Sequence, residues 1–302
     1  MGGGKPPGRP HHSGPGLGRS RVRGRVRVRI DRSCLAGCRS RTRTWWRGSR
    51  GGPWSAEGQW TANRADGGTY VASVPWSRGS YLDAHQSPGH GLRRLGTDWI
   101  DVYQMHHVDR RVPWEEIWQA MERLIADGKI LYVGSSNFAG WHIAQANETA
   151  QQRHRLGLIS EQSLYNLCER SIELEVLPAC RAYGVGVVPW SPLHGGALGG
   201  ILAKADRNRS AGGRAEGYLE ENREQVEAFE DLCRDLDEEP ANVALAWLLH
   251  QDGVTAPIIG PRTTGQLDGA VRAVELQLDE ATLRRLDELF PGPGPAPEAY
   301  AW

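Results

Sequence analysis

The chain has 302 residues, enough for one large domain or two ordinary ones, and its formal net charge of zero combines two opposed segments. Residues 1–90 carry 16 Lys and Arg against 4 Asp and Glu, whereas residues 91–302 carry 20 against 32. No apolar run reaches the roughly 18 residues of a membrane-spanning helix, and no secretory signal opens the chain, so we expect a cytoplasmic protein without a membrane span.

Residues 1–90 form a basic segment whose composition does not suit a hydrophobic core. They are rich in Arg, Gly, Pro, Trp and Ser, and the one strand candidate is GTYVASVPW at 68–76. Arg alternates with Val from Arg21 to Arg29, and Trp45 and Trp46 follow, a combination that also suits phosphate contacts and base stacking. Known RNA-binding motifs are absent, so disorder is the expectation and a nucleic-acid-binding arm is the alternative.

From residue 91 onward, short apolar strands alternate with helices. One helix has a clear period, because Ile117, Met121, Leu124 and Ile125 fall on one face and Gly128 fits its end. The expected strands are IDVYQM (100–105), ILYVGSSN (130–137), LGLISEQSLYN (156–166), VGVVPWSPL (185–193) and TAPIIG (255–260). Such alternation predicts an α/β fold with a parallel sheet. Right-handed crossovers would close it into a (β/α)8 barrel of TIM-barrel type, with strands 4–8 recognisable and the first three units missing or scrambled.

Polar or aromatic residues stand where each predicted strand ends. They are His106, Ser136 with Asn137, Gln162, Trp190 with Ser191, and Gly260 with Arg262. Each alone has a structural explanation, such as a helix cap, a core tryptophan or a surface cation. Together they favour a site, because the strands of a parallel barrel end on the face where barrel enzymes place their chemistry. We expect no metal, since Cys34 and Cys38 lack a second ligand pair at metal spacing.

Seven stretches of the second segment share a resemblance to a known family. They are LGTDWIDVYQMHHVD, GKILYVGSSNF, SEQSLYN, VVPWSPLHGG, ALAWLLHQ, IIGPRTTGQLDGA and LDELFPGPGPAPEAYAW. Jointly they resemble the aldo/keto reductases over residues 91–302, near a bacterial branch similar to the potassium-channel β-subunit-like reductases, whereas residues 1–90 do not match. The resemblance implies NADPH-dependent reduction of a small aldehyde or ketone to an alcohol.

The resemblance also implies a role for each strand-end residue. His106 is the active-site histidine that orients the substrate carbonyl, and His107 is a neighbour without that role. The positions that bind the nicotinamide carboxamide are matched by Ser136, Asn137 and Gln162, and the ring stacked on the nicotinamide is matched by Trp190. The pyrophosphate loop is matched by Ser191, Leu193 and Gly195. The adenosine end is matched by Gly260, Arg262 and Gln266. An arginine there suits a 2′-phosphate, so NADP(H) is favoured over NAD. Ala270 departs from the Asn that the family often has near the adenine.

The same resemblance implies an Asp, a Tyr and a Lys that residues 1–90 do not supply. In the family a Tyr donates the proton, and a Lys paired with an Asp lowers the pKa of that Tyr. The Lys ends the third strand, and the Asp and Tyr lie in a D-x-x-x-x-Y-G pattern after the second. Lys5, Tyr70 and Tyr81 do not fit these positions.

Three functions therefore stay open: an NADP-dependent reductase impaired in this chain, a non-catalytic NADP-binding protein of the same fold, and a reductase remnant with a basic nucleic-acid-binding arm. A further hypothesis is that residues 1–90 are a GC-rich coding region translated in the wrong frame, because such a frame yields Arg, Gly, Pro, Trp and Ser. Translating the other two frames upstream of Leu92 tests it. Trp114 and the loop at 194–218 are the candidates for substrate preference, and no oligomeric state follows from the sequence.

Overall fold

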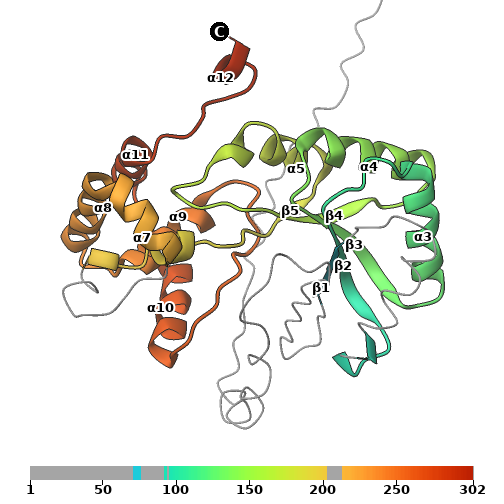
Figure 1. Cartoon of the computed structure of the whole chain (residues 1–302), viewed down its shortest axis with the longest axis horizontal. Coiled ribbons are helices and arrows are strands. Elements are labelled where there is room, and N and C mark those ends of the chain that lie inside the picture. Colours follow the sequence, from blue (N-terminus) through green and yellow to red (C-terminus); the bar gives the residue numbers. More distant parts are fainter. Residues whose placement is uncertain (1–70, 76–91, 94, 203–212, 302) are drawn as a thin grey trace, which may run out of the picture. The chain divides into compact units, whose positions relative to one another are not determined.

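The computed structural model describes residues 71–75, 92–93, 95–202 and 213–301 (Figure 1). Its strands are β1 (Val71–Pro75), β2 (Ile100–His106), β3 (Ile130–Ser136), β4 (Leu158–Gln162) and β5 (Gly186–Val187). Its main helices are α3 (Trp114–Ala126), α4 (Gly140–Gln152), α5 (Val176–Tyr183), α7 (Gly213–Glu221), α8 (Arg223–Asp235), α9 (Pro240–His250), α10 (Thr264–Glu275) and α11 (Glu280–Leu289). Within these ranges no helix is long and apolar enough to cross a membrane. The expectations of disorder, nucleic-acid binding or a wrong reading frame for residues 1–90 lie outside the described residues, apart from β1.

The five strands form one parallel sheet in chain order, β1-β2-β3-β4-β5. Neighbouring parallel strands joined through helices are the arrangement of a (β/α)8 barrel, as the sequence predicted. The register also aligns the strand ends, because Pro75 lies opposite His106, His106 opposite Ser136, and Ser136 opposite Gln162. Four consecutive strands therefore end in one row, and the residues that follow β2, β3 and β4 begin at the same edge of the sheet.

The two ends of the predicted strand series differ from expectation. β1 lies within the weak candidate at 68–76, so a strand of the segment considered missing or scrambled is present beside β2. The predicted strand TAPIIG is not continuous, although Thr255 N donates to Val187 O (2.8 Å) and Ile258 N to Pro189 O (2.7 Å). Pro257 has no N–H to donate, which limits this pairing to a short parallel contact beside β5.

Helix α3 packs its apolar face into the core. Ile117, Met121 and Leu124 are buried as predicted, but Ile125 is 41% exposed, so the apolar face is narrower than the sequence period indicated. Full burial of each such side chain contributes about 1.5–3 kcal/mol. The buried indole of Trp118 also donates to the backbone oxygen of Ala146 at 2.8 Å, which joins α3 to α4.

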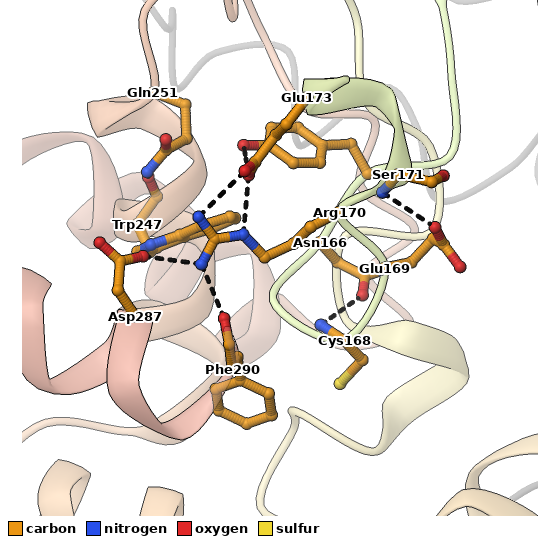
Figure 2. Close-up of polar contacts among 11 residues, drawn as sticks. Asn166, Cys168, Glu169, Arg170, Ser171, Glu173, Trp247, Gln251, Asp287 and Phe290 are labelled. Atoms are coloured by element: carbon orange, nitrogen blue, oxygen red, sulfur yellow. Dashed lines mark hydrogen bonds and ion pairs between the residues drawn. The ribbon is translucent and has the colours of Figure 1, made fainter. Parts of the chain in front are cut away.

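Arg170, in the segment after β4, connects that segment to the C-terminal helices (Figure 2). Its side chain is 12% exposed, and its Nε donates to Glu173 Oε1 at 2.7 Å. Its Nη1 donates to Asp287 Oδ1 of α11 and to the backbone oxygen of Phe290, both at 2.7 Å. The guanidinium also lies 5.0 Å from the ring centroid of Trp247 in α9. These contacts anchor the segment after β4 on two helices.

Candidate active site

The row of strand ends brings three predicted side chains into one hydrogen-bonded group. His106 ends β2, Asn137 follows β3, and Trp190 follows β5. The amide nitrogen of Asn137 lies 3.4 Å from His106 Nε2, and its amide oxygen accepts a hydrogen bond from Trp190 Nε1 at 3.1 Å. All three side chains are partly buried. The arrangement places an imidazole, an amide and an indole ring side by side at the edge of the sheet.

The two adjacent histidines are in different environments. Burial lowers the pKa of His106 below its ordinary value, and His107 lowers it further, so the His106 imidazole is neutral near pH 7 and able to offer a hydrogen bond without charge. His107 is exposed and has a left-handed backbone with φ of 62°. The rings meet edge to face at 4.2 Å between centroids. The structure thus assigns the inward, partly buried position to His106.

Asn137 is not a helix cap, which was the structural alternative for this position. Helix α4 begins at Gly140, with Ala139 as its N-cap residue. Asn137 instead has a left-handed φ of 57°, a conformation that Asn adopts more readily than most residues, and its N–H donates to Gln162 O at 3.0 Å. This turn directs the chain away from β3 and leaves the Asn137 amide at the strand-end row.

Ser136 carries a buried hydroxyl group that forms no hydrogen bond with the described residues. It is fully buried, and no described residue pairs with its Oγ. Since a buried polar atom without a partner is costly, Ser136 fits a ligand that offers a donor or an acceptor at this point. Asn137 and the half-buried Gln162 stand beside it in the same row. The three residues therefore fit an amide group such as the nicotinamide carboxamide.

Glu161 is a feature of this site that the sequence reasoning missed. It is 0% exposed within β4, and it accepts hydrogen bonds from Phe138 N (3.1 Å), Ser163 Oγ (2.7 Å) and Ser135 Oγ. Burial raises the pKa of Glu161 to about 7, and these hydrogen bonds limit the rise. An acidic residue inside an apolar strand is rarely buried without partners, so its place in LISEQ was an available signal.

The loop after β5 contains the residues predicted to contact a pyrophosphate. Ser191 and Gly195 have left-handed φ values of 54° and 68°, and Leu193 packs against the core. The Asn166 side chain donates to Ser191 O at 3.0 Å, which ties this loop to the anchored segment after β4. Left-handed residues turn backbone N–H groups toward a common point, and such points bind anions.

The predicted adenosine end lies at the start of α10. Gly260, Arg262 and Gln266 are all exposed. Gln266 N donates to Thr263 Oγ1 at 3.3 Å and the Gln266 side chain accepts from Thr263 N at 3.3 Å, which forms a capping box. The same Gln266 oxygen accepts from Arg262 N at 2.7 Å. Gln266 therefore orders the turn that presents Arg262. The Ile258–Pro189 backbone contact holds this turn next to the segment that carries Trp190.

Comparison with known proteins identifies relatives of this chain. The sequence profile of the aldo/keto reductase family matches residues 70–290, a range that includes β1. The oxidoreductase YrpG of Bacillus subtilis is 54% identical over 212 residues, which cover 70% of this chain and 65% of YrpG. Versiconal hemiacetal acetate reductase of Aspergillus parasiticus is 32% identical over 236 residues, 76% of this chain and 67% of that protein. The crystal structure of a thermostable aldo-keto reductase in complex with the inhibitor epalrestat matches 72% of this chain and 70% of its own, with a TM-score of 0.56 and 26% identity. The chain thus spans about two thirds of the length of these relatives.

Proposed function

The chain belongs to the aldo/keto reductase family, and we propose that its strand-end site binds NADP(H) beside a small aldehyde or ketone. One observation carries the proposal: His106, Asn137 and Trp190 form a connected group beside Ser136, whose hydroxyl has no hydrogen-bond partner among the described residues. Amide and hydroxyl groups match a carboxamide, and the partly exposed indole offers a face for a flat ring. The bound dinucleotide would supply the hydride that reduces the carbonyl carbon.

His106 is suited to orient the carbonyl substrate. Its lowered pKa keeps it neutral, so it is able to donate an N–H to a carbonyl oxygen without itself carrying a charge. Arg262 supports a preference for NADP over NAD, because its guanidinium is exposed at a helix start and a guanidinium binds a phosphate through two parallel hydrogen bonds.

We propose impaired catalysis because the family's proton donor is a tyrosine whose pKa is lowered by a lysine. The family resemblance places a lysine at the end of the strand before that of the histidine. In this chain β1 occupies that place beside β2, and its last residue is Pro75, opposite His106. With proline instead of lysine at this position, the end of β1 supplies no cation to lower the pKa of a tyrosine, so reduction is expected to be slow although the cofactor binds.

Non-catalytic NADP binding is the second candidate, since it needs only the residues that the site retains. The nucleic-acid-binding arm, the cytoplasmic location and the carbonyl substrate stay predictions. A salt-sensitive RNA affinity that disappears when residues 1–90 are deleted would identify the arm.

Titration of the full chain with NADPH tests the proposal, with the quenching of protein fluorescence as the signal and NADH as the matched comparison. We expect saturable binding that is tighter for NADPH, together with weak turnover of a panel of aldehydes and ketones. Saturable binding without turnover would select the non-catalytic candidate. Absence of binding to both nucleotides would reject the proposed function.

A further inference from the structure

The Glu161 carboxyl group contacts the chain on both sides of the residues that face the carboxamide site. Ser135 and Phe138, which it binds, flank the pair Ser136–Asn137 in the sequence. Ser163, its third partner, and Glu161 itself flank Gln162. One buried carboxyl group therefore joins the end of β3 to the end of β4 around all three polar positions.

We propose that Glu161 is the positioning residue of the nicotinamide site, fixing the turn at Asn137 and Phe138 and thereby the direction of the Asn137 amide. The inference rests on the proposed NADP(H) binding. The turn needs such support, because a left-handed backbone is unfavourable for a residue with a side chain, and Asn137 has a φ of 57°. The bond from Phe138 N to the carboxyl group secures the peptide that follows Asn137.

The ionised carboxyl group holds the turn more firmly than the protonated one. The ionised carboxylate accepts a hydrogen bond from each of its three partners. A protonated carboxyl group carries an O–H of its own, so one of the three partners has to accept that hydrogen instead of donating one. Ser135 is the residue able to adjust, since its Oγ also lies 3.4 Å from Ser160 O. Cys180 of α5 also interacts electrostatically with Glu161, but burial raises the pKa of the Cys180 thiol to about 12, so the thiol stays neutral.

Two substitutions separate positioning from packing. Glu161→Met keeps the volume but leaves Phe138 N–H without an acceptor, so NADPH affinity at pH 8 is expected to fall roughly tenfold or more. Glu161→Gln restores an acceptor for Phe138 and Ser163 and a donor for Ser135, so it recovers most of that affinity. Met121→Ala, in the buried face of α3, is the control for a general loss of stability.

The second measurement needs no cofactor. Hydrogen exchange of the Asn137 and Phe138 amides reports the turn directly, and we expect faster exchange in Glu161→Met but not in Met121→Ala. Between pH 8 and pH 6, wild type is expected to lose several-fold more NADPH affinity than Glu161→Gln. The titration of the 2′-phosphate does not affect this comparison, because both proteins bind the same nucleotide.

The outcomes distinguish this inference from the proposed function. If wild type binds NADPH and Glu161→Met binds it equally well with unchanged amide exchange, Glu161 has no positioning role. If no protein of the set binds NADPH but the turn exchanges faster in Glu161→Met alone, the proposed function fails and the control of the turn by Glu161 stands.

Discussion

The indole of Trp190 donates a hydrogen bond to the side-chain oxygen of Asn137, with 3.1 Å between Nε1 and Oδ1. Asn137 follows β3 and Trp190 follows β5, so the contact crosses the end of β4. On its other side, the same amide faces His106. The contact therefore fixes the position of an aromatic ring relative to the histidine, and a ring stacked on that indole would lie close to a carbonyl bound by His106.

Replacing Asn137 with alanine is expected to weaken NADPH binding roughly tenfold, because both amide contacts are lost and alanine tolerates the left-handed backbone less well. The dissociation constant from fluorescence titration is the measurement. Asn137→Gly is the matched variant, since glycine accepts the backbone conformation but has no amide. Equal losses in both variants would assign the effect to the amide. Recovery in the glycine variant would contradict that assignment and point to backbone strain.

Replacing Arg262 with alanine should lower the affinity for NADPH roughly tenfold and leave the affinity for NADH nearly unchanged, because only NADPH carries the 2′-phosphate. The ratio of the two dissociation constants is the readout, and it does not depend on the fraction of active protein. Arg285→Ala is the control, since Arg285 is an exposed residue of α11 paired with Glu288. An equal loss for both nucleotides would show that Arg262 does not recognise the 2′-phosphate.

The order of the strands and the residues at their ends were predictable because both are local features. An apolar run followed by a polar residue, such as IDVYQM before His106, is visible without knowledge of the fold. The limits of the last strands were not predictable from apolar character alone, since Pro257 interrupts the pairing beside β5. β1 was only weakly indicated, because its apolar run is short and stands in a segment of unusual composition.

The contacts of Glu161 and Arg170 could not be predicted, because they connect residues far apart in the chain. Glu161 binds Ser135, which lies 26 positions away, and Arg170 binds Asp287, which lies 117 positions away. No periodicity relates such pairs. The roles of Glu161 and Arg170 therefore emerge only when the strands and helices are placed in space.

Replacing Arg170 with alanine is expected to destabilise the protein by about 3 kcal/mol, mainly because Glu173, whose side chain is 19% exposed, loses its partner in a poorly hydrated position. The loss of the pair with the more exposed Asp287 adds less. The loss of the cation–π contact with Trp247 acts in the same direction (Figure 2). Urea unfolding followed by circular dichroism measures the change. Arg234→Ala, which removes an exposed pair with Asp231, is the control and should cost less than about 1 kcal/mol. Similar losses in both variants would mean that the Arg170 contacts add no more than a surface pair.

Replacing Glu161 with glutamine is expected to stabilise the protein above pH 7, although it does not improve cofactor binding. Burial raises the pKa of Glu161 from 4.5 to about 7, so the folded state binds more protons than the unfolded state between these values. Wild type therefore loses stability as the pH rises through this window, by roughly 3 kcal/mol in total, and the glutamine variant does not undergo that loss. The free energy of unfolding of both proteins is measured at about pH 5, 6, 7 and 8, and the difference between wild type and variant is followed with pH.

Glu122→Gln is the control of opposite sign for the pH series. Arg153 binds Glu122 through its Nε at 2.7 Å and lowers the pKa of that carboxyl group, so ionised Glu122 stabilises the fold above pH 4.5. The Glu122 variant should therefore be less stable than wild type at pH 7, whereas the Glu161 variant should be more stable. The effects of His106 and His142, whose lowered pKa values raise stability with pH, are common to all three proteins. If the stability difference between wild type and Glu161→Gln does not change between pH 5 and pH 8, Glu161 does not titrate in this window, and the pH dependence of cofactor binding assigned to it fails as well.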